Sequence, residues 1–271
     1  MEKKISRVAI VSDEFNEKAM KRFVGLCDSL VAMMRAEVIT DLDSGLQAPP
    51  DLIVVLGGDG FMLKTINKYW GLKAPFLGIN FGRKGFLLNE DRQNIVSMIA
   101  KGKYKVYKLP LLKVSAFSAD GIFCADVSAN DIYLKMLTSQ AVRLEIKIND
   151  SYIPEIMGDG LVVSTALGST AYNLSAGGAI VHPSLPVICV TSINEIFPQR
   201  MPPMVLSLDT AVSIKVIEPK KRRVRITSGE PFSLDDVISA KIENSGCTFS
   251  LALLKGEDDF LERIIEKVIK S

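Results

Sequence analysis

Apolar and polar positions follow two different spacings over the first hundred residues. Short apolar runs predict strands, and apolar positions three or four residues apart predict helices. The predicted strands cover residues 5–12, 37–40, 51–56 and 75–79, and the predicted helices cover 14–34, 61–70 and 92–101. The run DLIVVL at 51–56 is apolar after its first residue, which is typical of a strand buried on both faces. This order predicts an α/β domain over residues 1–101, with a parallel sheet covered by helices on both sides.

The pattern changes after residue 101. Runs such as KYKVYKL, LLKVSAF, VRLEIKI, VISAKI and TFSLALL alternate apolar and polar residues and are separated by turn residues. We therefore expect a mainly antiparallel β domain over residues 102–256, and both a sandwich and a more elaborate arrangement fit the pattern. Residues 257–271 return to helical spacing, and we expect this helix to pack back on the first domain.

Composition narrows the class of protein. With 48% hydrophobic and 24% charged residues the chain can bury a substantial core, and its net charge of +2 does not suggest a nucleic-acid partner. The four cysteines are far apart and form no C-x-x-C pair, which disfavours a zinc knuckle and suits a reducing compartment. Residues 160–194 lack charge but are rich in Ser, Thr, Gly and Pro, so they do not predict a membrane span. We expect a cytoplasmic protein.

The sharpest local motif is Gly57-Gly58-Asp59-Gly60, directly after the buried strand. The carboxyl ends of parallel strands open onto the ligand crevice, and glycines followed by a helix N-terminus let backbone N–H groups approach a phosphate. Gly57 and Gly58 are therefore candidate phosphate-binding residues, and Asp59 is a candidate catalytic carboxylate. The alternative, that Asp59 only caps the helix, has similar weight at this point. The motif lacks the spacing of a P-loop or a dinucleotide fold and is shared with some lipid kinases and phosphofructokinases.

Three further segments follow the glycine motif in order. They are GINFGRKGFL at 78–87, the pair Asn130-Asp131, and the block from 158 to 178 that contains DGL, ST, GSTAY and SAGG. Together with the glycine motif these segments closely resemble NAD kinases, strongly over about residues 53–183 and in outline elsewhere. Each motif alone is weak or moderate, whereas the ordered set is highly specific.

The resemblance implies transfer of the terminal phosphoryl group of ATP, or of polyphosphate, to the 2′-hydroxyl of the adenosine ribose of NAD, giving NADP. It implies that Asp59 acts on that hydroxyl, with NAD in the cleft between the domains. It also implies a divalent metal ion, Mg²⁺, carried on the donor phosphates without a dedicated protein site, and a homodimer or homotetramer. The NAD-binding residues that it implies are Gly60, Lys64, Asn80, Phe81, Asn130, Asp131, Asp159, Thr170, Ala171, Tyr172 and Ser175. Lys64 is explained equally well as a solvated helix lysine.

Three departures from the family pattern leave open which phosphoryl donor is used and which contacts the C-terminal motif makes. Phe61 stands where Thr, Ser or Asn is usual, Ala166-Leu167 replaces Pro-Thr/Ser, and Ser228-Gly229-Glu230 replaces Asp-Gly-Gln. Two rival functions remain: a lipid kinase with the same glycine motif, and a sensor that binds NAD or NADP without turnover. The Asn130-Asp131 pair and the STAY-type block weigh against the lipid kinase, because a lipid headgroup does not need them.

Overall fold

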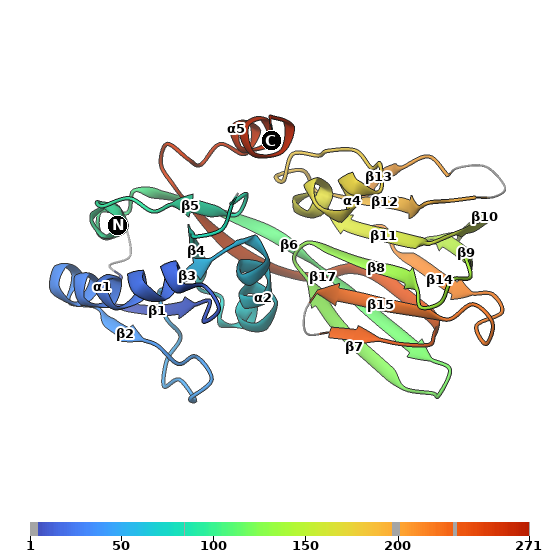
Figure 1. Ribbon diagram of the computed structural model, residues 1–271, viewed down its shortest axis with the longest axis horizontal. Coiled ribbons are helices and arrows are strands. Elements are labelled where there is room, and N and C mark those ends of the chain that lie inside the picture. The colour runs from blue at the N-terminus through green and yellow to red at the C-terminus, as the bar shows by residue number, and fades with distance from the viewer. Residues whose placement is uncertain (1–4, 84, 197–200, 230–231, 271) are drawn as a thin grey trace. The chain divides into compact units, whose positions relative to one another are not determined.

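The computed structural model describes residues 5–83, 85–196, 201–229 and 232–270 (Figure 1). The chain forms two compact units. One consists of Met1–Leu109 with Thr248–Ser271, and the other of Pro110–Cys247. Two long strands, β6 (Tyr104–Ser118) and β17 (Val237–Leu254), each continue from one unit into the other. The domain limits that the sequence suggests, after residues 101 and 256, stay a prediction.

A parallel sheet forms the centre of the first unit. Its strands are β1 (Arg7–Ser12), β2 (Glu37–Ile39), β3 (Leu52–Gly57), β4 (Pro75–Asn80) and the short β5 (Leu88–Glu90). The order is β2-β1-β3-β4, with all pairs parallel. Strand β4 pairs with β17 near its start and with β5 near its end. Every residue of β3 is buried, as the continuous apolar run predicts.

Helices cover both faces of this sheet because alternate residues of its strands point to opposite sides. Helices α1 (Glu17–Met34) and α3 (Ile95–Ala100) share one core cluster with one set of alternate strand residues, among them Val54 and Ile79. The other set, which includes Val55, is equally buried. Helix α2 (Asp59–Tyr69), whose Met62 and Ile66 are buried, contacts β3 and β4. A short 3₁₀ turn, Trp70–Leu72, follows α2.

The C-terminal segment returns to the first unit, as expected. It forms α5 (Phe260–Ile264) and then one π-helical turn, Ile265–Ile269. Phe260 is 1% exposed and its ring contacts Phe86 and Tyr107. The expected fold class of the first domain and the expected docking of this helix are therefore confirmed.

The second unit is a sandwich of two mainly antiparallel sheets. One sheet contains β10 (Ser151–Gly158), β9 (Val142–Ile148), β14 (Val212–Val216), β17, β6 and β7 (Phe123–Ser128). The other has the order β13 (Met204–Ser207), β12 (Val187–Ile193), β11 (Gly160–Thr165), β8 (Asp131–Met136), β15 (Val224–Gly229), β16 (Phe232–Leu234). Inward residues of both sheets, such as Ile132, Leu144 and Ile226, form one core cluster. This resolves the arrangement that the sequence left open.

Two sequence-based expectations for the second unit were wrong. The runs KYKVYKL and LLKVSAF belong to one strand, β6, and VISAKI and TFSLALL belong to one strand, β17. In β17 the intervening Gly246 has φ +72° and lies inside the strand, so the glycine produces a local irregularity and does not end the strand. The second expectation was that no helix forms between residue 102 and the C-terminal segment, whereas a 3₁₀ turn, Leu167–Thr170, and the short helix α4 (Tyr172–Ser175) lie in this region. Within the described residues, no helix is long and apolar enough to cross a membrane.

Candidate active site

The glycine motif forms the turn between β3 and α2. Gly58 is the N-cap residue of α2 and Asp59 is its first residue, and no side chain caps this helix. The Asp59 carboxylate instead reaches the loop after β4. Its Oδ2 accepts the backbone N–H of Phe86 and its Oδ1 accepts that of Leu87, both at 2.8 Å. The alternative prediction, that Asp59 only caps the helix, is therefore wrong.

Glycines allow the two motif loops of this unit to touch. A Cβ added at Gly82 would lie 3.4 Å from the Cα of Gly58, and one at Gly85 would lie 2.8 Å from the side-chain amide carbon of Asn80. The Phe81 N–H donates to the Gly57 carbonyl at 2.8 Å. Asn80 Oδ1 accepts the Gly82 N–H at 2.9 Å. The sequence-predicted residues Asn80 and Phe81 thus lie beside the Asp59 turn.

Burial dominates the electrostatics of Asp59. It raises the pKa of the carboxyl above its ordinary value, while the Leu87 and Phe86 amides and the charges of Lys267 and Arg263 act to lower that pKa. The net direction is upward. A carboxylate with a raised pKa is a stronger base than an exposed aspartate, so the site favours proton acceptance by Asp59.

The remaining candidates of the first unit lie on α2. Gly60 and Lys64 are exposed, with Lys64 little more than one turn beyond Asp59. Phe61, the unusual residue at its position, is half-buried, and its ring lies 2.9 Å from where a Cβ on Gly57 would be. The bulky ring therefore packs on the glycine turn, in a place where the family usually has a small polar side chain.

In the second unit, Asn130-Asp131 lies where β8 begins. Asn130 Nδ2 donates to Asp131 Oδ2 at 3.2 Å. The Asn130 carbonyl accepts the Thr165 N–H at 2.9 Å and lies 2.2 Å from where a Cβ on Gly168 would be. Only glycine at 168 allows this approach, so the ST and GST motifs fix the backbone of the Asn-Asp pair.

Asp131 has a strongly perturbed acidity. Burial raises the pKa of its carboxyl to about 6, against lowering contributions from the Tyr172 backbone amide and the Asn130 side chain. The Tyr172 ring packs edge-on against Tyr133, with ring centroids 5.0 Å apart. Asp131, Tyr133 and Tyr172 thus form one group on the outer face of the second sheet, because Ile132 and Leu134 face the core.

The motif block from 158 to 178 is held rigidly by its own polar residues. Asn173 is fully buried; its Nδ2 donates to the Ser169 and Ala179 carbonyls, and its Oδ1 accepts the Thr191 hydroxyl at 2.7 Å. Ser169 Oγ accepts the Val181 N–H at 2.9 Å. This framework positions the predicted residues that follow or flank it, which are Thr170, Ala171, Tyr172 and Ser175. All four are at least partly exposed.

Asp159 lies at the other end of β11, between β10 and that strand. Its Oδ2 accepts Asn194 Nδ2 at 2.8 Å, and its carbonyl accepts the Met136 N–H at 2.9 Å. Because Gly160 pairs with Lys135, four residues along β8 from Asp131, Asp159 is separated from the Asn-Asp pair by most of the length of β8. A ligand that contacts both carboxylates must therefore be extended.

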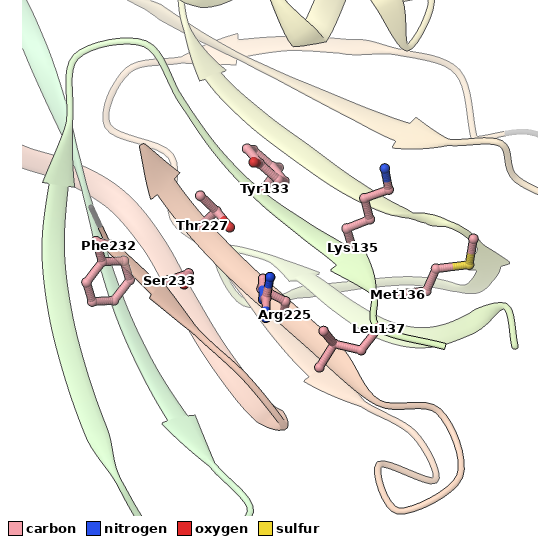
Figure 2. Close-up of a pocket in the computed structure, with 8 residues that line it drawn as sticks. All are labelled: Tyr133, Lys135, Met136, Leu137, Arg225, Thr227, Phe232 and Ser233. Atoms are coloured by element: carbon pink, nitrogen blue, oxygen red, sulfur yellow. The ribbon is translucent and has the colours of Figure 1, made fainter. Parts of the chain in front are cut away.

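A pocket of about 460 Å³ occupies the outer face of β8, β15 and β16 (Figure 2). It is lined by Tyr133, Lys135, Met136, Leu137, Arg225, Thr227, Phe232 and Ser233. Lys135 and Arg225 are directly opposite each other in the ladder, and the Arg225 guanidinium is bonded to the Asp235 carboxylate through two nitrogens. Sequence reasoning did not find this pocket, although Tyr133 shares an alternating face with Asp131.

Two further interactions were missed from the sequence. Arg263 and Lys267 of the C-terminal helical segment contact the loop that holds Asp59. In the second unit, buried Ser228 donates its hydroxyl to the Asp126 carboxylate of β7. Ser228 stands where the family usually has aspartate, so an acid is supplied here from a neighbouring strand. Glu230 of the same motif lies outside the described residues.

Comparison with known proteins identifies both parts of the chain. Residues 8–103 match the family model described as the ATP-NAD kinase N-terminal domain, and residues 129–240 match the ATP-NAD kinase C-terminal domain. NAD kinase of Xylella fastidiosa is 32% identical over 218 residues, covering 80% of this chain and 83% of the relative. NAD kinase of Clostridium kluyveri is 31% identical over 248 residues, covering 89% and 86%.

Solved structures share the fold. Yeast NADH kinase complexed with NADH superposes with a TM-score of 0.82 at 22% identity, over 98% of this chain and 88% of that one. An NAD kinase from Archaeoglobus fulgidus in complex with ATP gives a TM-score of 0.75 at 24% identity, over 98% and 99%.

The α/β unit with its glycine turn and the β-sandwich with its hydroxyl-rich block define a nucleotide-dependent phosphotransferase. The chain belongs to the NAD kinase family, and its reaction is the ATP-dependent phosphorylation of NAD.

Proposed function

We propose that Asp59 acts at the 2′-hydroxyl of the adenosine ribose of NAD, which makes NADP the product. The observation that supports this role is the position of the carboxylate. It lies at the carboxyl end of β3, next to the glycine turn, and two backbone amides fix its orientation. A carboxylate has about four lone-pair positions, so the two amides leave others for a substrate hydroxyl.

The proposed step balances as a simple displacement. The ribose oxygen attacks the γ-phosphorus of ATP, the bond from that phosphorus to the β–γ bridging oxygen breaks, and ADP leaves. The hydroxyl proton passes to Asp59 as the new bond forms. An acid whose ordinary pKa is about 3.9 is a weak base toward an alcohol, so the proton passes to Asp59 late in the transition state. Positioning of the two oxygens supplies most of the rate gain.

A divalent metal ion, Mg²⁺, is proposed to arrive on the ATP phosphates. Mg²⁺ is commonly held by substrate phosphates and waters with one or two carboxylates, so it can be carried by ATP without an all-protein site. When bound, the ion neutralises charge that develops on the phosphates. Gly57 and Gly58 are the proposed phosphate-binding residues of the chain.

We propose that the second group of residues recognises NAD itself. Asn130 and Asp131 together can donate to and accept from a pair of vicinal hydroxyls. Tyr172 offers an aromatic face beside them, with Thr170, Ala171 and Ser175 on the same exposed segment. Asp159, at the far end of β11, is assigned to the nicotinamide half, which requires the dinucleotide to bind extended.

Two broader parts of the proposal concern the state of the protein in the cell. We propose a cytoplasmic homodimer or homotetramer, on the strength of the family membership and the four separate thiols. Light scattering coupled to size exclusion tests the assembly directly, and a monomer at micromolar concentration would contradict it.

The experiment that tests the acceptor position uses the purified protein with ATP, MgCl₂ and either NAD or 2′-deoxyadenosine NAD. We expect NADP from NAD, detected by an NADP-specific dehydrogenase, with the new phosphate assigned to the 2′ carbon by ³¹P–¹H correlation. No product is expected from the deoxy analogue. Phosphorylation of the analogue at a similar rate would overturn the proposed acceptor, and no turnover of NAD by folded protein would overturn the function.

A further inference from the structure

Two cations of the C-terminal segment, one buried and one half-buried, lie against the loop whose amides donate to Asp59. Arg263, in α5, is 4% exposed, and Lys267 lies one turn further along. Arginine is almost never buried this deeply unless its donors are bonded, because desolvating a charge is expensive. Burial lowers the pKa of the Lys267 ammonium from its ordinary value. Their placement therefore needs a specific reason.

The donors of both cations go to backbone carbonyls of one short stretch. Lys267 Nζ donates to the Gly85 carbonyl at 2.6 Å. Arg263 Nη1 donates to the Phe86 carbonyl at 2.7 Å and to the Leu88 carbonyl at 2.8 Å, and more weakly to Gly85 at 3.4 Å. The same stretch supplies the N–H groups of Phe86 and Leu87 that Asp59 accepts.

These contacts bond two consecutive peptide groups at both their C=O and their N–H ends. The Gly85 carbonyl and the Phe86 N–H belong to one peptide unit, and the Phe86 carbonyl and the Leu87 N–H to the next. In a trans peptide the C=O and N–H point in opposite directions. Drawing each oxygen toward the helix therefore turns the attached N–H away from it, toward the Asp59 carboxylate. Each of the two peptide groups therefore lies between a cation, Lys267 or Arg263, and the Asp59 carboxylate, with its dipole aligned along that direction. Hydrogen bonds in such a chain polarise one another.

We propose that Arg263 and Lys267 are positioning residues for the phosphoryl transfer, which act through peptide units 85–86 and 86–87 to orient the Asp59 carboxylate and hold it ionised. The inference rests on the proposed role of Asp59 at the ribose hydroxyl. The charges of Lys267 and Arg263 support it, because both act to lower the pKa of the Asp59 carboxyl, which burial raises.

A purely architectural role explains Arg263 better than Lys267. Arg263 also donates through Nε to the Glu257 carbonyl at 2.6 Å and lies 3.7 Å from the Glu257 carboxylate, so it ties down the whole C-terminal segment. Lys267 is bonded to the Gly85 carbonyl, and the segment is already anchored by the buried ring of Phe260. A substitution of Lys267 can therefore distinguish a role in positioning Asp59 from a role in holding the C-terminal segment in place.

The test compares Lys267→Met, which keeps the length of the side chain, with Lys267→Arg, which keeps a charged donor. Lys270→Met is the matched control, because Lys270 is on the same segment, is exposed, and bonds to Glu266. We expect Lys267→Met to lower kcat by about tenfold with less than a threefold change in KM for NAD. Lys267→Arg is expected to recover most of the loss, and Lys270→Met to match the wild type.

The dependence of kcat on pH distinguishes the positioning role from a simple loss of structure. The acid limb of kcat follows protonation of Asp59, whose charged neighbours are Lys267 and Arg263, with Glu257 and Glu90 close to both cations. Removing a cation raises the Asp59 pKa, so the limb should move upward by about half a pH unit or more in Lys267→Met. The amide proton shifts of Phe86 and Leu87 should titrate with the same displacement, independently of activity.

The combination with Asp59→Asn separates this inference from the proposed function. If Asp59→Asn lowers kcat by about 10²-fold or more, and Lys267→Met adds no further loss to the residual rate, both hold, because the lysine acts through the carboxylate. If Asp59→Asn lowers kcat in this way but Lys267→Met alone changes neither kcat, the acid limb nor the amide titrations, the positioning role is wrong and the proposed function stands. If Asp59→Asn retains turnover, the proposed function is wrong, and the inference fails with it.

Discussion

Gly168 lies directly against the backbone of Asn130: a Cβ atom added at Gly168 would come within 2.2 Å of the Asn130 carbonyl oxygen. The contact joins a motif in the 3₁₀ turn after β11 to the pair at the start of β8. Gly168 has no positive φ, so its requirement for glycine comes from this close approach and not from its backbone conformation.

Gly168→Ala should therefore displace Asn130 and Asp131. We expect KM for NAD to rise about tenfold or more and the free energy of unfolding to fall by about 1–3 kcal/mol, as in other overpacked sites. The matched control is Gly25→Ala in α1, where no atom lies within 4 Å of an added Cβ. That variant should gain about 0.5–1 kcal/mol from helix propensity and keep its activity. Equal behaviour of the two variants in urea unfolding and kinetics would contradict the packing argument.

Binding of NAD should weaken in acid because of Asp131. Its carboxyl has a pKa of about 6, and protonation turns one of its two acceptor oxygens into a donor and removes the charge that strengthens hydrogen bonds from hydroxyls. We predict that KM for NAD rises as the pH falls through 6, with Tyr172 as the neighbouring titratable group. Asp131→Asn should raise KM at neutral pH and lose this dependence. A KM that is flat between pH 5 and 7.5 in the wild type would refute the assignment.

Asp131 should also influence stability, with a definite sign. The folded protein holds this proton more tightly than the unfolded chain, because the pKa rises from 3.8 to about 6 on folding. The contribution of Asp131 to the free energy of unfolding therefore decreases as the pH rises through this range. Between pH 4 and pH 7, the free energy of unfolding of the wild type should fall by about 2–3 kcal/mol relative to that of Asp131→Asn. Denaturant unfolding of both proteins at the two pH values measures the difference, and a constant offset would show that the carboxyl titrates normally.

Buried Asn89 should be essential for the stability of the first unit. It is 0% exposed, its Nδ2 donates to the Gly78 carbonyl at 2.9 Å, and its Oδ1 accepts the Leu254 N–H at 2.8 Å. These bonds join β5 to β4 and β17. Asn89→Leu would leave a buried donor and acceptor unpaired, which costs about 1–3 kcal/mol each. Thermal unfolding should show the loss, whereas Gln93→Leu, at an exposed position of the same unit, should remain close to the wild type. A melting temperature of Asn89→Leu similar to that of the wild type would contradict the role.

The sequence predicts the first unit well because its signals are local. The apolar run of β3, the glycine turn and the helical spacing of α1 and α2 are each contained within a few neighbouring residues. It predicts which motifs matter in the second unit, but it breaks the long strands β6 and β17 at turn-like residues that the sheet tolerates. Propensity alone does not show that neighbouring ladders continue through Gly246.

The parts of the site that were missed depend on contacts between distant positions. Arg263 and Lys267 reach carbonyls between residues 85 and 88, about 180 positions away in the chain, and no local pattern marks a helix lysine as the donor to a distant loop. The bond from Ser228 to Asp126 joins two strands in the same way. The role of Asp59 itself was inferred from a motif, whereas its bonds to Phe86 and Leu87 are visible only in the folded structure.

The central claim is that the Asp59 carboxylate serves the reacting hydroxyl, and the most direct test is the comparison of turnover and NAD affinity in Asp59→Asn. Titration calorimetry gives the Kd for NAD, and the coupled assay with saturating ATP and MgCl₂ gives kcat; Asp28→Asn, an exposed acid on α1, is the control. We predict that kcat falls by about 10²–10⁴-fold while the Kd changes less than about threefold. A folded Asp59→Asn protein with kcat within tenfold of the wild type would contradict the account.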